Sequence, residues 1–518
     1  MSDIVKNSAT PPPDGLIKKY GYHVILIFLA IIFYLPYLWH AQPSLLDDPW
    51  YFYMAKNLNI FDIQSILTAH GGRLIPFTII FYYFNYQLAH FDFFWVISLR
   101  LVELGAIILL IYYLVKRFVD ERLAFWCAAV ILFSAPMVTN FYELETQDHI
   151  SLLLILIFSL VYFKLTNPSF ENQNKLKRVG YGAISFIVLL CFLLTKETNI
   201  FITAVFAVLF GLDWFCKQVR RIKLLHLFYF IVCALFAMIF FIYSGQIKGG
   251  SMGYGPSNIL PAIWGYAKIL NLSWFFIIYA LVLFTFRVKK DFGYALTDNR
   301  WQLFFLLMAV FSFCIYLPWS SVADRYLLMP FVFIALLAFI NFNLIVKKYV
   351  WFIVVGLAVA GNLYFSVFHF VRFYGARQSD ARLMNYLVKN ASQYDQVCLP
   401  LSVGSNETII QMDIWLNKIN KLNKKVCTLS SLTSGFFTGE DKLLDNSGIL
   451  YGDRVVITSS TLVIQKETTG VVDYPLDAKY IFQPSEHLNF HIYNIHPTRG
   501  FEIKKFDWIV GTVKKLNI

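Results

Sequence analysis

Two adjacent carboxylates, Asp47 and Asp48, follow the first long apolar run of the chain and precede Pro49. Because neighbouring carboxyl groups repel when both are ionised, one of them is a candidate general base. The alternative is a solvated helix start, since Asp before Pro commonly begins a helix. Trp50 and Tyr51 follow directly, and aromatic residues of this kind gather at membrane faces, which favours the catalytic interpretation.

Three cations stand at the ends of apolar segments. Arg73 follows His70 and two glycines, where an arginine at a helix start can hold a phosphate, or simply snorkel from a turn. Lys196 interrupts a long apolar stretch, where a charge costs ~2.5–3.5 kcal/mol, so we expect it to pair with Glu197 or to face an anionic headgroup. Arg325 suits phosphate through its planar fork, with an interfacial anchor as the alternative.

Further acidic residues open another apolar run. On a helix, Glu145 and Asp148 share a face at i, i+3, as do Glu145 and His149 at i, i+4. This group, with Glu143 beside it, could bind a divalent metal or support a catalytic carboxylate. Carboxylates also favour a helix N-terminus through its dipole, so the metal stays open. Carboxylates and cations at one membrane face are what a reaction on a lipid phosphate needs, because cations offset the leaving group's charge.

The composition indicates that membrane-spanning segments position these groups. Of 518 residues, 58% are hydrophobic and only 15% are charged, whereas soluble domains carry about a quarter charged residues. Several apolar runs reach the ~20 residues that cross a bilayer. The net charge of +12 collects in short tracts between these runs, as a topology signal does, and not on one nucleic-acid-binding face. We therefore expect a lipid bilayer and no nucleic acid as partner.

The connections between apolar runs alternate in charge, which predicts the topology. Basic tracts at residues 18–19, 116–117, 164–178, 217–223, 287–290 and 347–348 are expected in the cytoplasm. Residues 74–88 are apolar but short, and are predicted to form an interfacial or re-entrant helix in a large first external loop. About eleven spans result, with the N-terminus inside and the C-terminus outside. They start near residues 22, 95, 122, 149, 179, 199, 224, 262, 301, 327 and 350.

This pattern predicts a mainly α fold in three parts: a cytoplasmic tail (1–21), a transmembrane helical bundle (22–372) and a small extracytoplasmic α/β domain (373–518). The first span is expected to be a retained anchor. In the last part, residues 396–401 and 453–459 are predicted strands, and residues 380–390 and 413–422 are predicted amphipathic helices. Cys398 and Cys427 could form a disulfide if this part is extracytoplasmic.

The order of the motifs resembles the GT-C class of membrane glycosyltransferases, and within it the superfamily of protein O-mannosyltransferases and lipid A aminoarabinose transferases. The resemblance covers residues 20 to about 370, and Glu197 departs from it because Gly is usual there. The matching segments are Leu46-Asp47-Asp48-Pro49-Trp50-Tyr51, Gly72-Arg73-Leu74-Ile75-Pro76, Arg100-Leu101, Glu145-Thr146-Gln147-Asp148, Leu194-Thr195-Lys196-Glu197 and Asp324-Arg325-Tyr326-Leu327-Leu328-Met329-Pro330.

The resemblance implies a polyprenyl-phosphate sugar donor, inverting transfer and an active site at the outer face of the plasma membrane, in a bacterium the inner membrane. Asp47 or Asp48 would be the base, and Asp148 would support the base or the acceptor. A glycan, lipid or protein acceptor stays open. Phosphate contacts would come from Arg73, Lys196 and Arg325, with His70, Arg100, Glu145 and Glu197 in support.

Two other functions fit the composition. A transporter or flippase of lipid-linked glycans would place ionisable groups near the midplane and often shows internal repeats. Here the charges gather near the outer ends, and no repeat is visible. A glycan ligase or polymerase would use the same chemistry to move a longer glycan.

Overall fold

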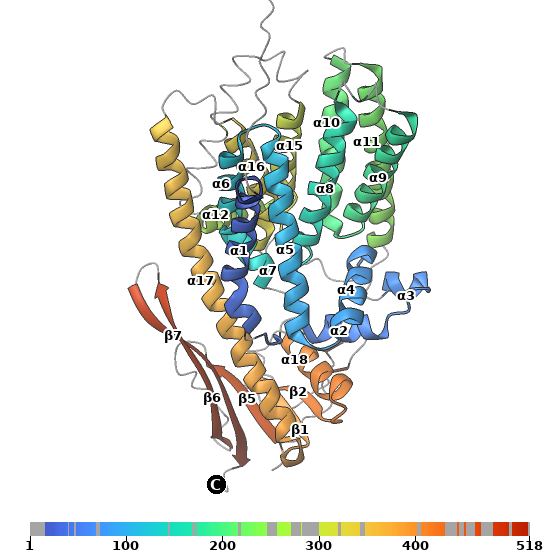
Figure 1. The fold of residues 1–518 in the computed structure, drawn as a ribbon. Coiled ribbons are helices and arrows are strands. Elements are labelled where there is room, and N and C mark those ends of the chain that lie inside the picture. Colours follow the sequence, from blue (N-terminus) through green and yellow to red (C-terminus); the bar gives the residue numbers. More distant parts are fainter. Residues whose placement is uncertain are drawn as a thin grey trace, which may run out of the picture.

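The computed structural model describes residues 16–39, 41–45, 48–68, 73–142, 146–167, 170, 174–215, 219–245, 256–270, 281, 300–319, 323–341, 348–400, 406–429, 443–444, 450–451, 461–467, 480–496 and 500–515. This part of the chain is mainly helical. The helices form a bundle, and the larger sheet lies at one end of it, beyond the short helices α2, α3 and α4 (Figure 1).

The long helices form the bundle and the short ones lie in its connections. The bundle contains α1 (Leu16–Trp39), α5 (Phe93–Lys116), α6 (Glu121–Leu132), α7 (Ala135–Tyr142), α8 (Asp148–Thr166), α9 (Lys175–Leu193), α10 (Ile202–Phe215), α11 (Arg220–Gly245), α12 (Ile259–Leu270), α15 (Arg300–Cys314), α16 (Leu328–Ile340) and α17 (Lys348–Lys389). The connections contain α2 (Asp48–Asn57), α3 (Ile63–Thr68), α4 (Pro76–Ala89) and the 3-10 segments η2 (Glu197–Phe201), η3 (Pro256–Asn258), η4 (Asp324–Leu327) and η6 (Ala391–Gln393).

Within the described part of the chain, seven helices are long and apolar enough to cross a bilayer: Gly21–Trp39, Phe93–Lys116, Asp148–Thr166, Lys175–Leu193, Glu197–Phe215, Arg220–Ile242 and Val355–Lys389. The pair α6 and α7, bent by 57°, adds an eighth if it is one span. Large apolar side chains point outward from these helices, with Phe28 59%, Ile187 57% and Phe241 62% exposed. Such surfaces are stable only in lipid, so the chain is a multi-pass membrane protein.

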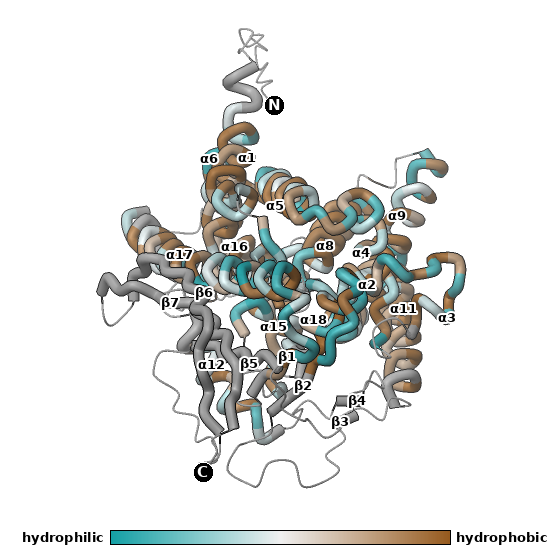
Figure 2. The backbone as a smooth tube through the Cα atoms, turned by 90° about the horizontal axis from the view of Figure 1, so that it is seen from below, coloured by the Kyte–Doolittle hydropathy of each residue, from teal (hydrophilic) through white to brown (hydrophobic). Residues whose placement is uncertain are grey.

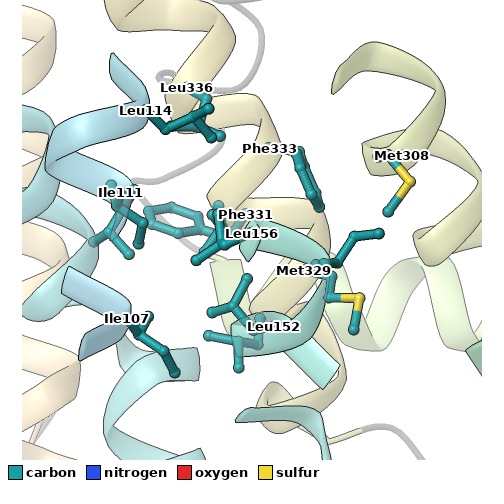
Figure 3. Packing of buried hydrophobic residues seen from close by; sticks show 14 of the residues in the cluster. Ile107, Ile111, Leu114, Leu152, Leu156, Met308, Met329, Phe331, Phe333 and Leu336 are labelled. Carbon is teal, nitrogen blue, oxygen red and sulfur yellow. The ribbon is translucent and has the colours of Figure 1, made fainter. Parts of the chain in front are cut away.

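The seven helices begin close to seven of the eleven predicted span starts. At the starts near residues 262 and 327, α12 has 12 residues and α16 has 13. Every residue of α16 is buried, because a helix that is apolar all round is stable in the centre of a bundle. Its Phe331, Phe333 and Leu336 pack among side chains of α5, α8 and α15 (Figure 3).

The apolar residues 74–88 form the short helix α4, as predicted, and not a helix of spanning length. Its first turn is held by the loop that follows α9. Phe77 N donates to Leu194 O at 3.0 Å, and Thr78 Oγ1 donates to Thr195 O at 2.7 Å. The helix therefore ties the loop before it to the Lys196 segment.

The C-terminal part contains a five-stranded sheet in the order β2-β1-β5-β7-β6. β1 runs parallel to β2 and β5, and β7 pairs antiparallel with β5 and β6. The strands are β1 (Gln396–Pro400), β2 (Lys425–Leu429), β5 (Thr461–Glu467), β6 (Tyr480–His496) and β7 (Gly500–Lys515), with a separate pair of β3 (Leu443–Leu444) and β4 (Leu450–Tyr451).

The strand predicted at residues 396–401 is β1, whereas residues 453–459 lie outside the described part. The helix predicted at 380–390 is the end of α17, which runs unbroken past residues 372–373. The helix predicted at 413–422 begins earlier, as α18 (Asn406–Asp413), and continues as the π-helix η7 (Ile414–Ile419). The extracytoplasmic position of this part stays a prediction.

The C-terminal part packs against the loop that follows α1. Leu45 is buried in a hydrophobic cluster with Leu383 of α17 and Met412 of α18. Leu45 N donates to Asp380 Oδ2 at 2.9 Å, and Trp50 N donates to Gln411 Oε1 at 2.8 Å. Seen from the sheet end, the mainly hydrophilic α2 and α18 lie among apolar helices (Figure 2).

Candidate functional site

Most of the predicted site residues are described, and three are not. Asp47, His70 and Glu145 lie outside the described residues. The others fall into two neighbouring groups at the end of the bundle where α2 and α4 lie. The first group contains Arg73, Asp148, Lys196, Glu197 and Arg325, and is called the cation cluster below. The second contains Asp48 and Arg100.

Lys196 and Asp148 form the centre of the cation cluster. Asp148 is the first residue of α8, where a carboxylate favours the helix dipole. Lys196 Nζ donates to the two carboxylate oxygens of Asp148 at 2.8 and 2.7 Å, and both side chains are buried. Burial lowers the pKa of Lys196, Asp148 opposes that shift, and the nearby charges of Arg325 and Arg73 add to it. Both arginines therefore lie within electrostatic range of this lysine.

Arg73 pairs with Glu197 through both edges of its fork. Nε donates to Oε1 at 2.7 Å and Nη2 donates to Oε2 at 2.9 Å. Lys196 and Glu197, which are neighbours in the sequence, bind different partners: Lys196 binds Asp148, and Glu197 binds Arg73. The pinning of α4 to the loop after α9 brings Arg73 and Glu197 together.

Stacked aromatic rings form one wall of the cation cluster. Tyr316 and Tyr326 lie 4.6 Å apart at 14°, and Trp319 lies 5.2 Å from Tyr326 at 19°. Lys196 Nζ lies over both tyrosine rings, at 5.2 and 5.0 Å. The Arg325 guanidinium lies 5.2 Å from the Tyr326 ring. Cation–π contacts of this kind hold the two cations beside each other without neutralising their charge.

The tyrosine hydroxyls add hydrogen bonds to the cluster. Tyr316 Oη donates to Asp148 Oδ1 at 3.2 Å, and Arg325 Nη2 donates to Tyr326 Oη at 3.4 Å. Burial raises the pKa of Tyr316 and of Tyr326, so both hydroxyls stay protonated at neutral pH. Sequence reasoning missed Tyr316 and Trp319, which no charge pattern singles out.

The two carboxylate oxygens of Asp48 differ in their contacts. Its Oδ2 accepts from Ser44 N at 2.8 Å and from Arg377 Nη1 at 2.5 Å. Arg377 also donates to Tyr142 O at 3.0 Å and to Gln42 O at 3.2 Å. Asp48 Oδ1 is buried and accepts no hydrogen bond from the described residues. Sequence reasoning also missed Arg377, because nothing in the local sequence marks this residue of α17 as buried.

A cavity of about 10 Å³, room for a single water molecule, joins Asp48 to Arg100. Arg100 Nη2 donates to Tyr82 Oη at 3.4 Å, and Nη1 lies 3.7 Å from Glu103. Arg100 thus lies beside the segment that contains Asp48. The cavity is lined by Asp48, Tyr51, Phe52, Tyr82, Asn85, Val96 and Arg100.

The group of residues that the sequence offers as a possible divalent-metal site is divided among other partners. Asp148 faces the Lys196 ammonium, which repels a second cation. His149 Nε2 lies 3.3 Å from Glu103 Oε1. Among the described residues, no three His, Cys, Asp or Glu side chains are grouped so as to hold a metal ion.

No family model matches the sequence, and no curated protein matches it. Among solved structures, the chain is similar to ArnT from Cupriavidus metallidurans in the apo state, at 12% identity and a TM-score of 0.47, over 79% of this chain and 86% of that one. For ArnT bound to undecaprenyl phosphate the values are 13%, 0.46, 78% and 77%.

The chain is also similar to the archaeal oligosaccharyltransferase AglB from Archaeoglobus fulgidus, in complex with an inhibitory peptide and a dolichol-phosphate. The identity is 10% and the TM-score 0.45, over 80% of this chain and 65% of that one.

Proposed function

We propose that the protein is a membrane glycosyltransferase that moves a sugar from a polyprenyl-phosphate-linked donor to an acceptor hydroxyl at the external membrane face. The observation that carries this proposal is the convergence of three cations. Arg73, Lys196 and Arg325 come from three separate loops: Lys196 and Arg325 lie over the same Tyr326 ring, and Arg73 lies within electrostatic range of Lys196. Asp148 and Glu197 balance two of the three positive charges, and a lipid phosphate would balance the net positive charge that remains.

The cluster suits a leaving group better than a simple headgroup anchor. When the bond between the sugar and the phosphate breaks, negative charge grows on the phosphate oxygens. Preorganised cations beside those oxygens stabilise this charge in a site with little water. Lys196 is nine-tenths or more buried, so its interaction with the developing charge is weakly screened.

The general base is assigned to Asp47, and Asp48 becomes a positioning residue. Asp48 already binds Arg377 and the backbone of Ser44 with one oxygen, and its side chain is buried. Its bonds anchor the start of α2, directly after Asp47. In the reaction, Asp47 takes the proton of the acceptor hydroxyl, whose oxygen attacks the anomeric carbon. The carbon–oxygen bond to the phosphate breaks, the configuration inverts, and the lipid phosphate leaves with the bonding electrons.

The external location is supported by the C-terminal part. Cys398 is disulfide-bonded, and disulfides persist in oxidising, extracytoplasmic compartments. The same part contacts the loop of Asp48 through Leu45 and Asp380. If the sheet is outside, the acid loop is outside as well.

The proposal is tested by mass spectrometry of surface glycans in cells with the gene, without it, and with Asp47→Asn. Loss of the gene should remove one glycan modification, and Asp47→Asn should remove the same one while the protein still inserts. Asp62→Asn is the matched control, an exposed carboxylate of the same loop, and should keep the modification. Full modification with Asp47→Asn removes this residue from the mechanism. Translocation of a lipid-linked glycan by the purified protein, without sugar transfer, would make it a transporter.

A further inference from the structure

We propose that Glu197 is a specificity-determining residue that occupies the phosphate-binding edge of Arg73 and adapts the cation cluster to a donor with one phosphate. This inference rests on the proposed function. The observation that carries it is the two-bonded pair between Glu197 and Arg73.

Glu197 imitates a phosphate in its contact with Arg73. Two parallel N–H···O bonds of 2.7 and 2.9 Å join the guanidinium fork to the two carboxylate oxygens. A phosphate binds an arginine through the same fork and with the same spacing of oxygens. A donor phosphate that uses this edge must displace Glu197, and one that leaves Glu197 in place meets the guanidinium only on its Nη1 side.

The exposure of the two partners allows this exchange. The side chain of Arg73 is 39% exposed and that of Glu197 is 16% exposed, whereas Lys196 and Asp148 are each only 7% exposed. A partly exposed ion pair contributes little net stability, because water competes for both partners. The Arg73–Glu197 pair is thus the part of the cluster that opens most easily.

Glu197 also sets the charge of the cluster. Arg73, Lys196 and Arg325 contribute three positive charges, and Asp148 and Glu197 contribute two negative ones, which leaves one net positive charge. A sugar joined to a lipid through one phosphate carries one negative charge, and a diphosphate link carries two. Complementary charge favours the single phosphate, and the second charge of a diphosphate would face Glu197 without a counter-ion.

The experiment measures binding of undecaprenyl phosphate and undecaprenyl diphosphate to the full-length protein in nanodiscs. Glu197→Gln keeps the shape and removes the charge, so it should shift the ratio of the two dissociation constants about tenfold toward the diphosphate. Glu197→Asp keeps the charge and should keep the ratio within about twofold of the wild type, well inside that tenfold shift. Glu121→Gln makes the same change in the Lys116–Glu121 pair and is the matched control.

The outcomes separate this inference from the proposed function. If both lipids bind and Glu197→Gln leaves their ratio unchanged, Glu197 does not set specificity and the proposed function stands. If neither lipid binds to the wild type, the donor class fails and the inference fails with it. The double variant Arg73→Gln/Glu197→Gln serves if the single variant does not fold. It restores the net charge, so both affinities should fall while the ratio returns to the wild-type value.

Discussion

Arg377 of α17 donates a hydrogen bond to Asp48 of α2 across 329 positions of the chain. Both side chains are buried, and Arg377 also holds the backbone oxygens of Gln42 and Tyr142. One arginine thus joins the loop after α1, the end of α7 and the C-terminal part of the molecule. The position of the Asp48 side chain depends on a residue far outside the motif that contains it.

Arg377→Gln is expected to destabilise the protein and to abolish transfer. It leaves the Asp48 carboxylate buried without its counter-ion, which costs ~3–5 kcal/mol. Thermal unfolding of the purified protein measures the loss. Arg372→Gln, on the exposed side of the same helix, should change the midpoint little. Asp48→Asn/Arg377→Gln should recover part of the stability but no activity, and an unchanged midpoint for Arg377→Gln would contradict the buried pair.

Binding of the donor phosphate should weaken in alkali before a free lysine would lose its proton. Burial lowers the pKa of Lys196 below 10.5, so its ammonium becomes neutral at a lower pH. As the pH rises, the affinity for undecaprenyl phosphate should therefore begin to decline before pH 10.5 is reached. Lys196→Arg keeps its charge throughout and should remove this alkaline decline. A decline that persists in Lys196→Arg would assign the titration to another group.

The free energy of unfolding should rise with pH in the same range in which phosphate binding falls. Between the lowered pKa of folded Lys196 and the value of 10.5, the unfolded chain binds more protons than the folded one. The free energy of unfolding contributed by this group therefore rises with pH in that window. Chemical unfolding across the window, with Lys196→Arg as reference, separates this effect from the loss of binding.

Peptide mapping without reduction should find Cys398 joined to Cys427. The register of β1 and β2 places the two residues opposite each other, and Cys398 is disulfide-bonded. Cys398→Ser/Cys427→Ser should lower the stability of the C-terminal part by ~2–4 kcal/mol, through greater freedom of the unfolded chain. Cys191→Ser, which removes a free thiol, is the control. A link from Cys398 to any other cysteine would contradict the pairing.

The sequence predicts the cation cluster because charges in apolar surroundings are costly and need a reason. Arg73, Lys196 and Arg325 are recognisable for that reason alone. The partners of these cations cannot be recognised in the same way. Lys196 and Glu197 are adjacent in the sequence but bind different residues, because the contact of α4 with the loop after α9 places Arg73 beside Glu197. Arg377 could not be predicted, because nothing local distinguishes a buried arginine from a solvated one on a long helix.

Hydropathy predicts helices well and their surroundings less well. The long spans follow from runs of about 20 apolar residues. The 13 residues of α16 are equally apolar, but protein and not lipid covers them, and composition does not distinguish the two. The composition changes near residue 373, although α17 continues to Lys389.

That continuity has a mechanical consequence. α17 has 42 residues, or about 63 Å of helix, roughly twice the thickness of the hydrocarbon layer. α17 continues past the length that spans the hydrocarbon layer without a break. It contains Arg377 and Asp380 before the chain reaches β1. The helix therefore connects the sheet to the turn before α2 without a flexible joint. An acceptor bound at the sheet would be held in a fixed position relative to that turn before the reaction begins.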